Sequence, residues 1–114
     1  MSKYMLLMRG SQTEFVKMSD AEQTRIIAEH RQWSQELISR QVFVDGNGFS
    51  NITLKLVPEK GKIRRIMQPY IDSAEELSGY YIITAESLEV ATEIAKTCPA
   101  LAHNESVEII PLGH

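Results

Sequence analysis

The sequence has few cysteines, no excess of positive charge and no long apolar run. A single cysteine, Cys98, excludes an internal disulfide and suits a reducing compartment. The net charge of -3 argues against a nucleic-acid surface, which requires a basic face. The N-terminal run YMLLM is five residues long and stops at Arg9, too short for a signal peptide or a membrane span. We therefore expect a cytoplasmic protein without a nucleic-acid or membrane partner.

The motifs of several enzyme classes are also missing. The glycines of DGNGF lack the third glycine of a dinucleotide loop, and no Lys-Ser/Thr pair follows for a phosphate loop, so this segment predicts a turn. His30, His103 and His114 do not have the spacing of zinc ligands, and we expect neither a metal nor a cofactor. Cys98 is expected at a helix C-terminus, where the dipole disfavours a thiolate, and is interpreted as a packing residue.

The composition is that of one globular domain, residues 1–114, with 43% hydrophobic and 24% charged residues. Ser19 and Glu22 form a capping box that begins a helix running to about Arg40. Ser87 begins a second helix that runs to about Cys98. The apolar stripe expected on this second helix consists of Leu88, Ala91, Ile94 and Ala95.

The remaining pattern predicts strands. Residues 3–9 and 80–85 are apolar on both sides, which is typical of strands buried from above and below. The order β-α-β-β-β-α-β indicates an α+β, ferredoxin-like fold with an extra hairpin strand, in which two helices back an antiparallel sheet. A turn at Gly61 joins the hairpin strands. Its basic stretch KGKIRR is interpreted as a solvated hairpin, with a site for an anionic ligand as the alternative.

The two helices can cover only one face of this sheet. Either Tyr4, Leu6 and Met8 or the opposite row of the first strand would then be exposed. Exposed apolar patches of this size usually mark an interface. A symmetric homodimer, sheet against sheet, is the simplest cover.

His30 is the residue that bears most directly on function, because it lies within the apolar stripe of the first helix. That stripe consists of Ile26, Ile27, Trp33, Leu37 and Ile38. In one interpretation the imidazole fills core volume and makes a single hydrogen bond. In the other it projects into a cleft beside the sheet, where a carboxylate orients it as a general acid or base. Burial would lower its pKa, and a carboxylate would raise it.

Several segments resemble the YCII-related proteins, in particular their DGPF branch. These segments are KYMLLMRG, H..W...L in the first helix, and LSGYYIITAESLEVATEIAKTCPA followed by SVEIIPL. The resemblance covers nearly the whole chain and implies a dimeric α/β-barrel built from ferredoxin-like protomers. It also implies a histidine-aspartate pair in a small pocket, but no particular reaction. Some members carry transcription-related labels, and some accompany alternative sigma factors.

The sequence departs from the Asp-Gly-Pro-Phe motif of that branch, which aligns with MQPY. Met67 replaces the aspartate and Gln68 the glycine. Pro69 is kept, and Tyr70 replaces the phenylalanine. The carboxylates that remain as partners for His30 are Asp72, Glu75 and Asp45.

Two hypotheses follow. The first is a homodimeric, enzyme-like protein that binds a small anionic or carbonyl-bearing metabolite, with His30 as general acid-base and Asp72 or Glu75 as its orienting carboxylate. Its predicted ligand-binding residues are Arg9, Trp33, Tyr70 and Tyr80. A surface charge is the alternative for Arg9, and a core packing role for Tyr80. The second hypothesis is a non-catalytic dimeric binding or regulatory module, such as an accessory to transcription through protein contacts, in which His30 is structural.

Overall fold

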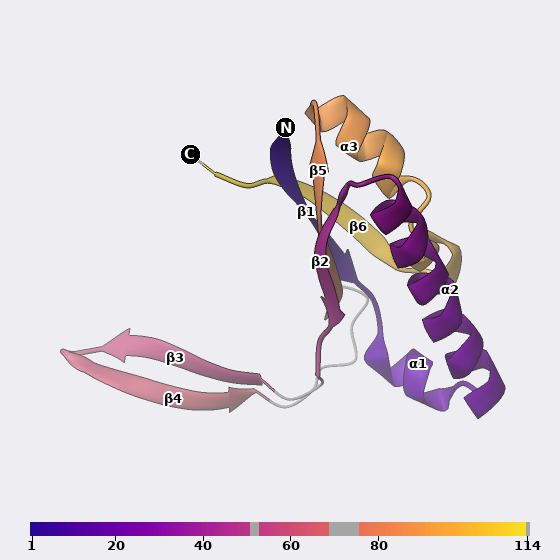
Figure 1. Cartoon of the computed structure of the whole chain (residues 1–114). Coiled ribbons are helices and arrows are strands. Elements are labelled where there is room, and N and C mark those ends of the chain that lie inside the picture. Colours follow the sequence, from indigo (N-terminus) through magenta and orange to yellow (C-terminus); the bar gives the residue numbers. More distant parts are fainter. Residues whose placement is uncertain (51–52, 69–75, 114) are drawn as a thin grey trace.

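The computed structural model describes residues 1–50, 53–68 and 76–113 (Figure 1). Its elements are β1 (Ser2–Arg9), α1 (Gln12–Lys17), α2 (Asp20–Ser39), β2 (Phe43–Gly48), β3 (Thr53–Glu59), β4 (Lys62–Gln68), β5 (Leu77–Ala85), α3 (Leu88–Ala95), a 3-10 helix (Pro99–His103) and β6 (Ser106–Pro111). The predicted α+β class and strand order are confirmed. Helix α1 was not predicted; Ser11 caps it by accepting a hydrogen bond from the Glu14 backbone N–H at 3.2 Å.

Four strands form the main antiparallel sheet, in the order β2-β5-β1-β6. The two strands with doubly apolar sequences, β1 and β5, are its central pair, as predicted. Strands β3 and β4 form a separate two-stranded hairpin that extends away from the main sheet (Figure 1). We call this hairpin, residues 53–68, the arm. The predicted turn is present, with a positive φ at both Lys60 and Gly61.

Helix α2 begins where the sequence predicts. Ser19 is the N-cap, and its Oγ accepts a hydrogen bond from the Glu22 backbone N–H at 3.2 Å. The helix then runs for 20 residues to Ser39. No helix in the part of the chain that the structure describes is long and apolar enough to cross a membrane.

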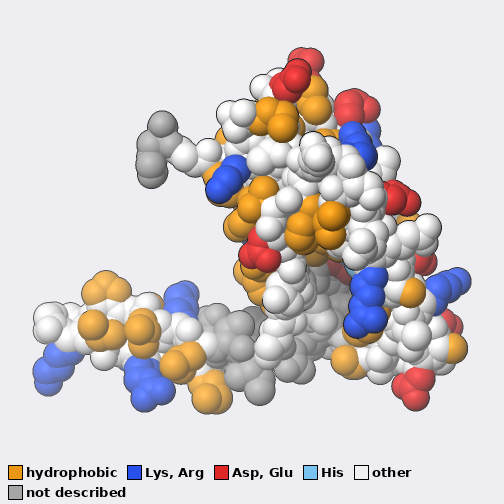
Figure 2. Space-filling model, in the orientation of Figure 1, with side chains coloured by type: hydrophobic (Ala, Val, Ile, Leu, Met, Phe, Trp, Pro, Cys, Tyr) orange, Lys and Arg blue, Asp and Glu red, His pale blue; other side chains and the backbone are white. Residues whose placement is uncertain are grey.

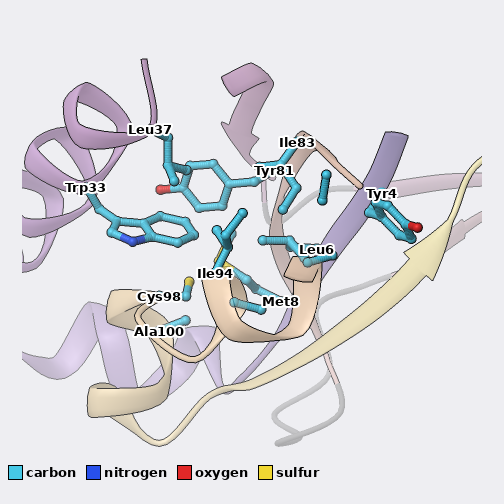
Figure 3. Packing of buried hydrophobic residues seen from close by; sticks show 13 residues of the cluster. Tyr4, Leu6, Met8, Trp33, Leu37, Tyr81, Ile83, Ile94, Cys98 and Ala100 are labelled. Atoms are coloured by element: carbon cyan, nitrogen blue, oxygen red, sulfur yellow. The ribbon is translucent and has the colours of Figure 1, made fainter. Parts of the chain in front are cut away.

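Helices α2 and α3 lie on one face of the main sheet (Figure 1). The core fills the space between these helices and the sheet. Leu6, Leu37 and Ile83 are its largest fully buried side chains. Figure 3 shows side chains from β1, β5 and α2 meeting there. The side chains of β1, β5 and β6 that point to the opposite face are only partly buried. They include Met5, Leu7, Ile82 and Ile110.

Several local predictions are wrong. The segment DGNGF does not form a turn, because β2 continues through Gly48 and pairs with β5. Gly46 lies opposite Tyr81, and a Cβ added there would be 2.6 Å from Tyr81 Cδ1. This glycine therefore permits close approach of a ring to the strand. Leu88, expected in the buried stripe of α3, is 49% exposed, whereas the rest of that stripe is buried.

The apolar stripe of α2 is also narrower than predicted. Ile26, Trp33 and Leu37 are buried, whereas Ile27 and Ile38 are 46% and 48% exposed.

Helix α3 also ends earlier than predicted, at Ala95, and Cys98 follows as the N-cap of the 3-10 helix. The Cys98 side chain is buried against the core. Burial raises the pKa of its thiol to about 11, so the thiol is protonated at neutral pH. The interpretation of Cys98 as a packing residue is confirmed.

Candidate functional site

A cavity of about 600 Å³ lies beside α2, lined by residues of β1, α1, α2, β2 and β5. Met8, Phe15 and Ile26 contribute apolar walls, and His30 and Arg31 contribute nitrogen donors. Sites for small molecules typically enclose about 300–1,000 Å³ and combine apolar walls with a few polar groups. The cavity has the size and lining of such a site.

Tyr81 of β5 holds the imidazole of His30 in the cavity wall. The His30 Nδ1 lies 2.7 Å from the Tyr81 hydroxyl, and the two rings stack with an interplanar angle of 12°. Trp33 packs its edge against Tyr81 with ring centroids 4.9 Å apart, and its Nε1–H donates to Thr97 Oγ1 at 2.9 Å. Figure 3 shows the Tyr81 ring beside Trp33 and Leu37, with its hydroxyl pointing toward α2. The position of His30 therefore depends on a ring that the core fixes.

Burial keeps both partners neutral. It lowers the pKa of His30, an effect that nearby His103 reinforces and Glu29 opposes. Burial also raises the pKa of Tyr81 to about 12. Ser34 donates its hydroxyl proton to the His30 backbone carbonyl at 2.9 Å. Because a phenol O–H is a stronger donor than a neutral imidazole N–H, we assign Tyr81 as the donor to Nδ1, which places the imidazole proton on Nε2.

No carboxylate among the described residues pairs with the His30 ring. Glu29, its neighbour on α2, instead pairs with His103 Nε2 at 3.0 Å. This hydrogen bond lowers the pKa of the Glu29 carboxyl. Within the described ranges no three His, Cys, Asp or Glu side chains cluster as metal ligands would. The contacts of His30 thus favour a neutral hydrogen-bonding ring.

The structure does not bring Tyr80, Asp45 or Arg9 to this cavity. Tyr80 points to the opposite face of β5 from Tyr81, and its hydroxyl donates to Asp45 Oδ2 at 2.8 Å. This hydrogen bond raises the pKa of Tyr80. Arg9 pairs its Nε with the carboxylate of Glu108 on the adjacent strand β6 at 2.5 Å.

The other predicted site residues are placed differently. Trp33 is 5% exposed and supports Tyr81 from the core. Tyr70, Asp72 and Glu75 lie outside the described residues. A carboxylate partner for His30 from that loop therefore stays a prediction.

Sequence reasoning missed Tyr81, the direct partner of His30. Because β5 is apolar on both faces, its pattern does not say which of two adjacent tyrosines faces the helices. A second missed contact lies in the cavity wall, where Ser78 donates a hydrogen bond to the Glu105 carboxylate. These residues are 27 positions apart, and no local signal connects them.

The partly buried imidazole of His30 is expected to make stability depend on pH. Since the pKa of His30 is lower in the folded chain than its ordinary value of 6.5, the unfolded chain binds more protons just below that pH. The free energy of unfolding should therefore fall as the pH is lowered from about 7.5 to about 5.5, and it should fall less in His30→Gln. Urea titrations at both pH values measure this fall. The variant His103→Gln measures the separate contribution of the ion pair between His103 and Glu29. An identical pH dependence in wild type and His30→Gln would contradict the assignment.

Comparison with protein-family models identifies the family of this chain. Residues 2–112 match the family model described as the YCII-related domain, which is essentially the whole chain. A comparison with curated proteins found no match. The family match agrees with the ferredoxin-like order of the main sheet. The chain therefore belongs to the YCII-related domain family.

Proposed function

We propose that the protein binds a small anionic or carbonyl-bearing metabolite in the cavity beside His30. The observation that carries this proposal is the imidazole, fixed by Tyr81 at 2.7 Å in the wall of a cavity of about 600 Å³. A neutral ring with its proton on Nε2 can donate a hydrogen bond to a ligand oxygen, or transfer the proton as charge develops there. Arg31, which also lines the cavity, supplies a cation for an anionic group.

The cavity could serve either of two functions: acid-base catalysis on the bound metabolite, or binding without catalysis. Catalysis is supported by the lowered pKa of His30, which keeps the ring uncharged near neutral pH. A non-catalytic binding or regulatory module is the second candidate, and it is favoured because no described carboxylate orients His30. Both forms use the same cavity, so binding is tested first and turnover of the bound ligand second.

The proposed active unit is a homodimer, formed sheet against sheet. It is supported by the partly buried apolar side chains of Met5, Leu7, Ile82 and Ile110, on the face opposite α2 and α3. Membership of the DGPF branch and a cytoplasmic location belong to the same proposal. They are supported by the segments that resemble that branch and by the single cysteine, which allows no internal disulfide.

The experiment that tests the proposal is a metabolite-binding screen on wild type, His30→Ala and His30→Gln in parallel. Removing one hydrogen bond should weaken binding of a hit about fivefold in His30→Ala, since such a bond contributes about 1 kcal/mol. His30→Gln keeps an N–H donor near the position of Nε2 and should recover part of the affinity. Thermal shift identifies hits and titration calorimetry measures their Kd.

The matched control is Gln32→Ala, an exposed position on the same helix that does not line the cavity. It should bind each hit as wild type does. Equal affinity of wild type and His30→Ala for every hit would contradict a role for His30. A hit that binds Gln32→Ala as weakly as His30→Ala would contradict the location of the site.

A further inference from the structure

The arm has one face that is almost entirely apolar. Paired residues of an antiparallel ladder point to the same side, so every second pair of β3 and β4 shares a face. One face consists of the pairs Leu54/Met67, Leu56/Arg65 and Pro58/Ile63. Its four large apolar side chains are exposed by 48% (Leu54), 59% (Leu56), 73% (Ile63) and 69% (Met67). An isolated two-stranded hairpin is at best marginally stable in water, so this face needs a cover.

The charge of the arm is opposite to that of the rest of the chain. Residues 53–68 contain five basic side chains and one acidic side chain, a net charge of +4. The whole chain has a net charge of -3, so the other 98 residues carry -7. Figure 2 shows apolar and basic side chains together on the arm, and acidic side chains interspersed with basic ones over the body. The body as a whole is therefore opposite to the arm in net charge, which favours contact between the arm and the body of a second copy.

The arm also points in the direction where a second copy would lie. In Figure 1 it leaves the main sheet on the side opposite α2 and α3, which is the side of the uncovered face. Each of its strands has seven residues, which gives a reach of about 20 Å. Sheets that pack face to face are only about 10 Å apart, so a copy on the uncovered face would lie within that reach.

We propose that the arm of one protomer docks on the body of a second copy, with its Leu54/Leu56/Ile63/Met67 face buried there. Among the described strands, β3 and β4 pair only with each other, so the cover comes from outside the main sheet. The proposal rests on the homodimer proposed above, but it concerns a separate surface. Its electrostatic part predicts that the dimer Kd rises with ionic strength.

The first test measures the dimer Kd by sedimentation equilibrium for Leu56→Ser/Ile63→Ser. We expect the Kd to rise at least tenfold. The matched control is Val16→Ser/Ile38→Ser, which removes exposed apolar side chains from α1 and α2 and should leave the Kd unchanged. Circular dichroism verifies that each variant is folded. An unchanged Kd in the arm variant would overturn the proposal.

The second test locates the contact directly. A photo-crosslinking residue replaces Ile63, and unlabelled protein is mixed with nitrogen-15-labelled protein before irradiation. Crosslinked peptides should pair a light arm with a heavy body, which only a contact between copies produces. Crosslinks confined to one copy would overturn the proposal. So would an arm that binds vesicles of phosphatidylserine and phosphatidylcholine through this face but does not crosslink to protein.

A variant on the sheet face separates this proposal from the dimer interface proposed earlier. Ile82→Lys should disrupt contacts between sheets and leave the arm face intact. If Ile82→Lys still dimerises and Leu56→Ser/Ile63→Ser does not, the arm proposal stands and the sheet interface fails. The reverse result overturns the arm proposal and leaves the sheet interface in place.

Discussion

Replacing Trp33 with alanine is expected to lower the free energy of unfolding by about 3–5 kcal/mol, the usual cost of removing a large buried aromatic side chain. The indole is 5% exposed, and its edge packs on the Tyr81 ring. The substitution leaves a cavity behind Tyr81 and also removes the hydrogen bond to Thr97. Guanidinium denaturation of wild type and variant measures the difference.

Two further variants show where this stability comes from. Gln32→Ala, at an exposed neighbouring position, should change the free energy of unfolding by less than about 0.5 kcal/mol. Trp33→Phe keeps an aromatic ring but loses the bond to Thr97, and should cost less than Trp33→Ala. A loss below about 1 kcal/mol for Trp33→Ala would show that Trp33 does not anchor the core beneath the site.

Replacing Gly46 with alanine is expected to damage both the fold and the site. The new Cβ would lie 2.6 Å from Tyr81 Cδ1 and 3.0 Å from Cε1. The Tyr81 ring cannot move away freely because Trp33 packs against it at 4.9 Å between centroids. Overpacking of this kind costs about 1–3 kcal/mol of stability. The displaced ring should also release His30, so ligands found in the binding screen should lose affinity.

Gly48→Ala is the matched control, because it adds the same methyl group to the same strand. Its nearest contact would be the Ser78 carbonyl at 3.9 Å, an ordinary packing distance. Its free energy of unfolding should stay close to that of wild type; because Gly48 also lines the cavity, stability alone is the control. Denaturation curves of both variants test this difference. Equal behaviour of Gly46→Ala and Gly48→Ala would contradict the close approach of Tyr81 to β2.

The sequence predicted those parts of the fold that local signals determine. Ser19 and Ser87 mark helix starts through their caps, and two doubly apolar segments identify the central strands. The segment DGNG was misread because glycines that permit a turn also permit close packing against a ring, and only the tertiary partner distinguishes the two. Helix α1 was missed because it has six residues and none of them is buried, so it lacks a clear apolar stripe.

For the candidate site, the sequence identified His30 but not its surroundings. The stripe of α2 located the ring, because helical periodicity is local. Its contact with Tyr81 joins positions 51 residues apart and depends on which face of β5 each tyrosine occupies. The family resemblance implied an aspartate as partner, whereas the described contact is a phenol. The sequence pattern therefore could not predict contacts between residues that only the fold brings together.

The burial of Cys98 has a practical consequence for studies of this protein in solution. Cys98 is 3% exposed, and the pKa of its thiol is raised to about 11. Because the thiolate is the species that reacts with maleimides and iodoacetamides, the native cysteine should resist alkylation while the chain is folded. A cysteine introduced on the surface would then accept a fluorophore or spin label selectively, and distances between the protomers of the proposed dimer could be measured in an otherwise wild-type background.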